Sequence, residues 1–448
     1  MNRKKKWLAP ALAAALCAAF LLGCGAPAEK AVETAPVETT APAVKEFTST
    51  DGKIAFTMDV PSTGRETAKS SVDVTPMDVT GEMAQSIAKV LLGEDAVFYM
   101  PRGERFDRIY TKKEIEEHLA FLEPYRNPAA MEKLYGESAE EYLERLEGAI
   151  ARYQELLTSA PEAVEDKLCD WAYRLNSSMN ESIDTWTVLD GVPFQFSVTV
   201  REQLRSGYRT AWISAYADRN VWEYDDVTPM LIDQKLRATP EPDEDQLQQV
   251  RAQAEKLLNG LGLGAWTVDG LKYASYEWGK TIRTVNLTAK QVLNGSPIVF
   301  NTDVPPVRMA QCEMGFSTEG KLISIELMTP VAVSSTASQV LLPEDALLQT
   351  ARETLQTWTI EKLWNGNNFW YNYTGESVDC RLEVTALEYG LIRVPNPDIM
   401  TYRYVPGLAV RGVKTFYNPE TGEELTPFEP QKESTLLVLN ALDGTVVY

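Results

Sequence analysis

The residues best suited to binding chemistry lie in one segment near the C-terminus, L-W-N-G-N-N-F-W-Y-N-Y-T-G-E, residues 363–376. Its aromatic rings, those of Trp364, Phe369, Trp370, Tyr371 and Tyr373, are interspersed with asparagines. Flat rings bury a large contact area and amides bind hydroxyl groups or peptide backbone, as a sugar- or peptide-binding surface requires. The pattern also fits a loop whose rings pack onto the core while the asparagines form turns. These five aromatic residues are the candidate ligand-binding set.

Carboxylates offer a second chemistry, because glycoside hydrolases use two Asp or Glu side chains at a set separation. The chain has 64 Asp and Glu residues, so a suitable pair arises somewhere by chance. The densest clusters are residues 223–227 and 241–246, and the second is typical of a linker followed by a helix N-terminus. Neither has the spacing of a calcium loop. We predict no catalytic residue, no metal site and no cofactor; a carboxylate-dependent cell-surface hydrolase is the alternative.

The single histidine, His118, restricts any histidine-dependent catalysis to one position. Thr111 and Glu114 precede it with the spacing of a capping box, which predicts the start of a helix. His118 lies one step away from the apolar face of that helix, beside glutamates. We therefore expect a histidine on the helix surface, without a catalytic role.

A reactive thiol stands near the start of the chain. Arg3 and three lysines precede an uncharged run, residues 7–22, which is shorter than the roughly 20 residues of a spanning helix. This arrangement is typical of a secretory signal peptide. The run ends Leu21-Leu22-Gly23-Cys24, which resembles the lipobox of Gram-positive bacterial lipoproteins. The resemblance implies that Cys24 receives a diacylglyceryl group and becomes the first residue; the alternative is an ordinary signal peptide in which Cys24 is incidental.

The segment after Cys24, residues 25–46, is rich in Ala, Pro, Thr, Val and Glu and has no aromatic residue. Such a sequence buries too little apolar area to fold and forms an extended spacer. Two acyl chains of palmitate length contribute on the order of 25 kcal/mol of gross membrane affinity, at ~0.8 kcal/mol per buried CH₂. We expect a protein held on the extracytoplasmic face of the cell membrane by a lipid anchor and a flexible tether.

The net charge and the cysteine count limit the classes of partner and the disulfide content of the protein. The formal net charge is −21, and removing the four basic residues of the signal peptide gives −21 − 4 = −25. This charge argues against nucleic acid as a partner, because nucleic-acid-binding proteins carry a basic surface. Besides Cys24, the cysteines after the signal peptide are Cys169, Cys312 and Cys380, too few for a disulfide framework and more consistent with thiols in the core.

Hydrophobic periodicity predicts the elements that hold these residues. We expect helices near residues 80–92, 138–158, 244–258 and from Pro343 onward, the second packed against a sheet. Alternating segments predict strands at 53–60, 193–200, 209–218, 271–278, 281–290, 321–328, 380–389, 408–417 and 435–448. Acidic-Gly pairs ending at Gly52, Gly320 and Gly444 predict tight turns.

The order of these elements predicts an α+β fold, in which two or three modules of helices pack on antiparallel meander sheets. We assign a signal peptide (1–23), a lipidated tether (24–46), an N-terminal domain (47–236) and two further modules (244–335 and 340–448). From about residue 240 the plan resembles PepSY-like and YycH/YycI-like extracytoplasmic modules, and the whole layout resembles clostridial-type lipoproteins of unknown function. These likenesses imply a non-catalytic binding, sensing or adaptor role toward a peptide, a glycan or a partner protein.

Overall fold

The computed structural model describes residues 45–102, 109–135, 139–175, 180–189, 192–202, 209–217, 242–277, 280–301, 309–317, 320–364, 378–394, 402–424 and 433–447. The chain divides into residues 1–41 and 42–448, and every described residue belongs to the second unit. The fold is mixed α+β, and 44% of the described residues are in strands against 28% in helices, so strands dominate it. Cys24 and the tether up to residue 44 lie outside the described residues, and their assignment stays a prediction.

One sheet, sheet B, is antiparallel throughout. Its order is β5 (Arg174–Leu175), β6 (Glu181–Leu189), β7 (Val192–Glu202), β8 (Arg209–Ala217), β13 (Leu322–Met328), β12 (Gln311–Phe316), β10 (Lys280–Leu293) and β9 (Ala265–Glu277). In the central strands buried and less buried residues alternate, as in β8. One face of sheet B therefore lies in the core, and among the described residues the other face, called the open face, is less buried.

The other sheet, sheet A, has long central strands, β15 (Asp379–Val394) and β16 (Tyr402–Tyr417). Beyond β16 lie β17 (Ser434–Asn440) and β4 (Ser70–Pro76), and β4 pairs in turn with β14 (Val331–Ser338). Beyond β15 lie β2 (Ile54–Thr57) with β1 (Glu46–Thr48), then β3 (Ser62–Thr63) and β11 (Ser296–Phe300). These pairs of β15 with β2, β3 and β11 are parallel, so the expectation of purely antiparallel meanders was wrong for sheet A.

The sheets do not follow the predicted division into 47–236, 244–335 and 340–448. Strands β1 to β4 belong to sheet A, where β2, β3 and β4 pair with strands from the last third of the chain and β1 pairs with β2. Phe47 and Ile54 share one buried cluster with Leu355 and Leu382. The hairpin from β10 to β11 then joins sheet B to sheet A. Non-local pairing of this kind depends on partners that local sequence patterns do not identify.

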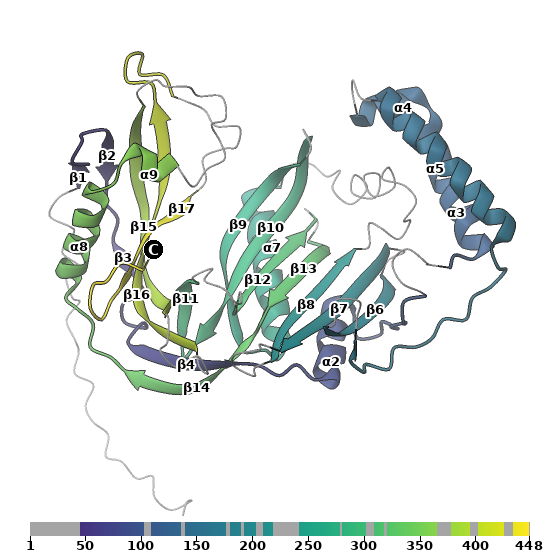
Figure 1. Ribbon diagram of the computed structural model, residues 1–448, viewed down its shortest axis with the longest axis horizontal. Helices are drawn as coiled ribbons and strands as arrows, with labels where there is room; N and C mark the ends of the chain where they lie inside the picture. The colour runs from purple at the N-terminus through teal and green to yellow at the C-terminus, as the bar shows by residue number, and fades with distance from the viewer. Residues whose placement is uncertain are drawn as a thin grey trace, which may run out of the picture. The chain divides into compact units, whose positions relative to one another are not determined.

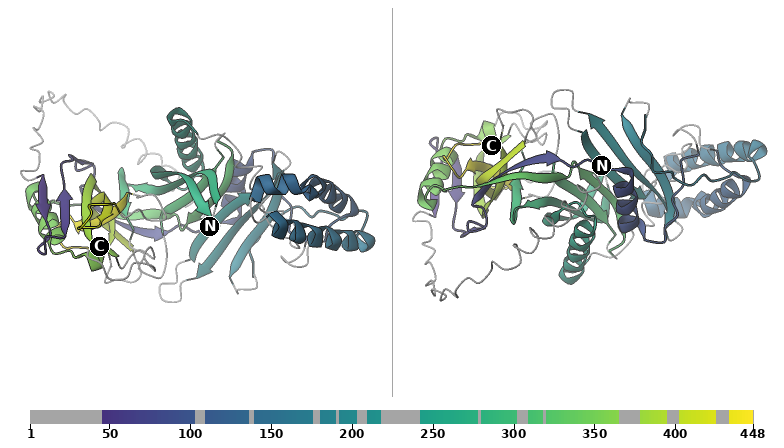
Figure 2. Two further views of the ribbon diagram at one scale, coloured as in Figure 1. Left: turned by 90° about the horizontal axis from the view of Figure 1, so that it is seen from above. Right: turned by 90° about the horizontal axis from the view of Figure 1, so that it is seen from below.

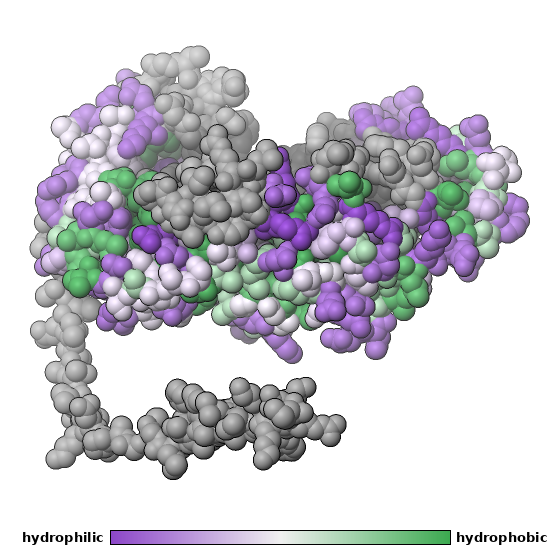
Figure 3. Space-filling view, turned by 60° about the horizontal axis from the view of Figure 1, so that its bottom comes forward, coloured by the Kyte–Doolittle hydropathy of each residue, from purple (hydrophilic) through white to green (hydrophobic). Residues whose placement is uncertain are grey.

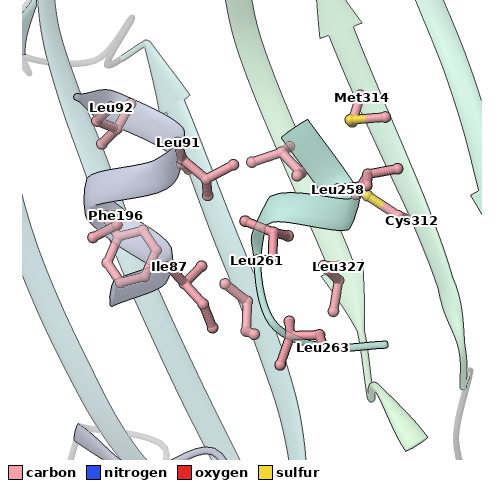
Figure 4. Packing of buried hydrophobic residues seen from close by; sticks show 14 of the residues in the cluster. Ile87, Leu91, Leu92, Phe196, Leu258, Leu261, Leu263, Cys312, Met314 and Leu327 are labelled. Carbon is pink, nitrogen blue, oxygen red and sulfur yellow. The ribbon is translucent and has the colours of Figure 1, made fainter. Parts of the chain in front are cut away.

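Two helices cover the buried face of sheet B, α2 (Gly81–Leu92) and α7 (Glu244–Gly260) (Figure 1). Figure 4 shows Ile87 and Leu91 of α2 near Leu258 and Leu261 at the end of α7, over strand residues such as Phe196. Thr80 caps α2 and Asp243 caps α7, so the acidic cluster at 241–246 does include a helix N-cap. On sheet A, α8 (Glu344–Gln356) and α9 (Ile360–Trp364) pack against strands β2, β15 and β16, and Pro343 is the N-cap of α8 rather than its first residue.

A helical insertion comprises α3 (Lys112–Leu122), the 3₁₀ turn η1 (Glu123–Arg126), α4 (Pro128–Tyr135) and α5 (Ala139–Ser159). The predicted capping box of Thr111 and Glu114 is present. Helix α5 packs on α3 and α4 rather than on a sheet, since its buried residues join a cluster drawn from the insertion and Tyr110 alone. In Figure 2 these blue helices extend beyond the end of sheet B.

The position predicted for His118 was wrong. The side chain is buried with only 4% of the residue exposed, and its ring meets the ring of Tyr153 edge-on at 4.7 Å between centroids. The one-step offset from the apolar face was misleading because Tyr153 of α5 and Phe121 of α3 both contact the His118 ring. The predicted tight turns are supported at Gly52, Gly320 and Gly444, whose φ angles are +74°, +79° and +76°. Within the described ranges no helix combines the length and hydropathy of a membrane span.

Candidate binding face

The aromatic residues predicted to bind a ligand are beyond what the structure describes. Trp364 is the last residue of α9, where the backbone alone is described. Phe369, Trp370, Tyr371 and Tyr373 lie outside the described residues, as does the acidic cluster at 223–227. Their binding role stays a prediction.

The open face of sheet B gathers exposed apolar side chains. Of the ten large hydrophobic residues exposed in the described part of the chain, the pairings place four on this face: Leu168, Val188, Trp212 and Tyr216. Trp212 is 48% exposed and Tyr216 is 38% exposed, although β8 is an interior strand. On the face turned to the viewer in Figure 3, by contrast, apolar and polar residues are interspersed. Apolar residues gathered on one face of a folded protein mark an interaction surface. We call this surface the aromatic face.

An apolar and aromatic row crosses the aromatic face from one strand to the next. The strand pairings place Leu168 opposite Tyr99, Tyr99 opposite Trp186, Trp186 opposite Gln195, and Gln195 opposite Tyr216. Strands in a sheet lie about 4.8 Å apart, so the four steps span about 19 Å. The rings of Tyr99 and Trp186 are 5.3 Å apart between centroids, and Tyr216 donates a hydrogen bond to the Gln195 amide oxygen.

Arg102 fastens the helical insertion to the end of this row. Its guanidinium lies 5.5 Å from the Trp186 ring centroid, and its side chain is only 10% exposed. It donates to Asp166 at 2.6 and 3.0 Å and to Glu114 at 2.9 and 2.8 Å. Hydrogen bonding to Asp166, helped by the charge of Glu114, raises the pKa of Arg102 despite its burial. Because Glu114 also forms the capping box of α3, this arginine couples the first helix of the insertion to the aromatic face.

The other half of the aromatic face is polar. In one row Ser197 lies opposite Ser214, Ser214 opposite Glu326, Glu326 opposite Glu313, and Glu313 opposite Thr288. Side chains of directly opposite residues are about 5 Å apart at Cβ, so two carboxylates stand side by side in this row. Hydroxyl groups and carboxylates can donate to and accept from a polar ligand lying across the strands.

Charged groups lie at the junction between the sheets, beyond the polar half. Asp269 of β9 pairs with Lys290 of β10 at 2.7 Å and accepts from the Thr288 hydroxyl at 2.8 Å. Lys290 also donates to the carbonyl of Val299 in β11 at 3.2 Å, which ties sheet B to sheet A. Burial alone would raise the pKa of Asp269, but Lys290, Thr288 and the nearby Arg411 together hold it below the ordinary value. These partners indicate a structural ion pair at the junction.

The cysteines of the described residues are poorly suited to act as catalytic nucleophiles. The thiols are unpaired with one another, and burial raises the pKa of Cys169, of Cys380 to about 12, and of Cys312 well above its ordinary value. A thiolate nucleophile needs the opposite shift. Within the described ranges, no three His, Cys, Asp or Glu side chains are grouped so as to hold a metal ion. The arrangement is suited to non-covalent binding by ring stacking and side-chain hydrogen bonds.

The aromatic face was missed at the sequence level, yet β8 contained a signal for it. In R-T-A-W-I-S-A-Y-A, residues 209–217, Ala211, Ile213 and Ala215 alternate with Trp212 and Tyr216. The small apolar residues mark the buried side of the strand, so the rings must occupy the other side. Recognising that side as open required knowing that α2 and α7 both lie on the opposite face.

Comparison with known proteins gives no assignment. No model of a known protein family matches the chain, and no curated protein matches it. One solved structure, that of an uncharacterised protein from Eubacterium rectale, aligns with a TM-score of 0.34 and 11% sequence identity, over 90% of this chain and 94% of that one.

Proposed function

We propose that this chain is a lipid-anchored extracytoplasmic binding protein whose ligand docks on the aromatic face. The observation that carries the proposal is the gathering of four of the ten described, exposed large hydrophobic residues on one face of sheet B, opposite the face that α2 and α7 cover. Trp212 and Tyr216 provide ring surfaces there, and the adjacent hydroxyls, amides and carboxylates provide hydrogen-bonding groups. The lipobox resemblance at Cys24 supports the location. In this proposal sheet B with α2 and α7, and sheet A with α8, are two helix-on-sheet modules that share a hairpin.

A glycan fits this surface better than an extended peptide does. A peptide that adds a strand needs a free sheet edge, but Trp212 and Tyr216 project from a strand paired on both sides. Ligand recognition at the middle of a sheet therefore depends on side chains. Rings stacked under sugar rings, together with hydroxyl and amide groups around them, recognise a neutral or amino-sugar oligosaccharide. The net charge of −21 disfavours an acidic polymer by repulsion.

The binding test compares Trp212→Ala and Tyr216→Ala with Val340→Ala, which removes apolar surface from a residue that is 91% exposed elsewhere. The probe is a series of N-acetylglucosamine and glucosamine oligosaccharides titrated by calorimetry. We expect each ring variant to weaken binding about tenfold or more, since a ring contact is worth about 0.5–1.5 kcal/mol beyond its buried area. Unfolding midpoints should stay unchanged. Absence of binding to every probe, or equal affinity in all variants, would count against the proposal.

The anchor has its own test. Cys24→Ala should abolish incorporation of labelled fatty acid and release the protein from the membrane fraction, with Cys17→Ala as the control, since Cys17 lies within the predicted signal peptide. Unchanged labelling and membrane retention of the Cys24 variant would contradict the lipoprotein assignment. The two tests are independent, because ligand affinity does not depend on the lipid.

The alternative is a carboxylate-dependent hydrolase, and one observation favours it. Glu313 and Glu326 are directly opposite residues on the aromatic face, so their Cβ atoms are about 5 Å apart, and retaining glycosidases use two carboxyl groups about 5–5.5 Å apart. Cleavage of a bound oligosaccharide by the parent chain, lost in both Glu313→Gln and Glu326→Gln, would establish this alternative. Binding without cleavage would favour the non-catalytic role.

A further inference from the structure

Strand β14 is an edge of sheet A that is open to solvent. Of the described strands it pairs with β4 alone, and its residues from Ala332 to Ser338 are all exposed, on both sides of the strand. In Figure 1 it lies beside β4 at the lower boundary of the sheet. Natural edge strands carry charges or prolines that prevent pairing with another chain. The sequence V-A-V-S-S-T-A-S of β14 has neither.

The hydrogen bonds at its two ends show which backbone groups point away from β4. Met77 donates to the carbonyl of Pro330 at 2.8 Å, and Gln339 donates to the carbonyl of Lys69 at 2.8 Å. Bonded and non-bonded pairs alternate along an antiparallel ladder, and one register shift lies between Val333 and Ser335. This alternation, followed inward from both ends of the strand, places the backbone N–H and carbonyl groups of Ala332 and Ala337 on the side of β4. Those of residues 331, 333, 336 and 338 point to the free edge.

An independent contact supports this count. The side-chain amide of Gln291 accepts from the N–H of Val331 at 2.8 Å and donates to its carbonyl at 3.1 Å. Gln291 therefore binds the backbone groups of Val331, the first residue of β14 whose N–H and carbonyl point away from β4. The other residues whose backbone groups point this way, Val333, Thr336 and Ser338, are exposed to solvent. The edge is closed at one end by a side chain and left open along the rest.

We propose that β14 is a dimer interface, in which two copies of this chain pair their β14 edges antiparallel about a two-fold axis at Ala337. Thr336 of one copy then lies opposite Ser338 of the other. Each such pair exchanges two backbone hydrogen bonds, and the two-fold axis creates two pairs, so four hydrogen bonds form. The sequence suits a self-complementary contact, because Thr336 faces Ser338 and Ala337 faces its own copy. No charged residue of β14 meets its own copy. This inference is independent of the proposed glycan binding, because the aromatic face is on sheet B.

The two-fold axis allows a direct test by cross-linking. The two Ala337 residues form a non-hydrogen-bonded pair, whose Cα atoms are about 4.5 Å apart in antiparallel sheets, a separation that a disulfide spans. Ala337→Cys in the full chain with Cys24→Ala should give a covalent dimer on mild oxidation. Val340→Cys is the control, because it is 91% exposed but, at about 3.4 Å per residue, would lie about 20 Å from its own copy.

Proline substitutions test the direction of the backbone groups. The N–H of Thr336 points outward, so Thr336→Pro should abolish the concentration-dependent dimer in sedimentation velocity and leave the unfolding midpoint of the monomer unchanged. The N–H of Ala337 points to β4, so Ala337→Pro should lower that midpoint. Added salt should strengthen the dimer, because each copy carries a net charge of −21.

A parent chain that stays monomeric throughout the micromolar range would overturn the proposal. So would equal cross-linking of the two cysteine variants, or a dimer that persists in Thr336→Pro. Capture of an extended peptide by a β14 edge that does not self-associate would show a different occupant and also refute it.

Discussion

Gln291 provides the sharpest test of how the two sheets are held together. Gln291 is only 1% exposed, and its side-chain amide makes three hydrogen bonds to the backbone. It donates to the carbonyls of Leu263 at 2.7 Å and Val331 at 3.1 Å, and it accepts from the N–H of Val331 at 2.8 Å. Gln291→Met keeps the length of the side chain and removes all three bonds. We expect the variant to leave buried backbone groups unpaired where β10 meets the start of β14.

The expected loss follows from the number of groups. A buried group left unpaired costs about 1–3 kcal/mol, and a carbonyl retains a second acceptor position, so we take about 1 kcal/mol for each of the three. The unfolding free energy should therefore fall by about 3 kcal/mol. Urea unfolding measures it as a shift of the midpoint at constant slope. Hydrogen exchange at the Val331 amide, which should become much faster, gives a local measurement that does not depend on two-state unfolding.

Gln311→Met is the matched control. Gln311 lies on the open face of sheet B, is partly exposed, and its amide contacts the sulfur of Met328 at 3.6 Å. Its replacement should change the unfolding free energy by no more than about 0.5 kcal/mol. A loss below about 1 kcal/mol for Gln291→Met, or equal losses for the two variants, would show that the buried amide does not stabilise this junction as argued.

Three further predictions concern charge and thiols. Arg102→Met should lower the unfolding free energy by about 1–3 kcal/mol, which is less than the about 3–5 kcal/mol for a fully buried pair because the side chains of Asp166 and Glu114 are 28% and 29% exposed. It should speed hydrogen exchange in residues 112–159 but not in β7, and equally faster exchange in both would contradict the role of Arg102. The lowered pKa of Asp269 stabilises the fold fully above the ordinary value of 3.8, and this stabilisation is lost as the pH falls through the pKa of the folded state. Asp269→Asn should therefore lower the unfolding free energy at pH 7 and make it depend less steeply on pH below about pH 4. An unchanged pH dependence would refute this prediction. The raised pKa values of Cys312 and Cys380 predict that a thiol reagent at pH 8 labels both after unfolding and neither in the native state, and rapid native labelling would contradict their burial.

Helix ends were predictable from sequence because capping is local. Thr80 and Asp243 accept from backbone N–H groups three residues on, and the box of Thr111 and Glu114 closes within one turn. The strands with strong alternation, β7 and β8, were predictable for the same reason. Strand β14 was not, since V-A-V-S-S-T-A-S has no apolar period and forms a strand only because β4 supplies a partner.

The sequence by itself determined the elements whose stabilising contacts are near neighbours along the chain, including the helix caps, the Gly turns and the alternation that puts Trp212 and Tyr216 on one side of β8. The tertiary structure decided what each element faces. It buried His118 against Tyr153, brought β1 to β4 to the last third of the chain, and left the side of sheet B away from α2 and α7 open. The physical reason is that the face of a strand or helix follows from local geometry, whereas its partner depends on contacts between residues hundreds of positions apart.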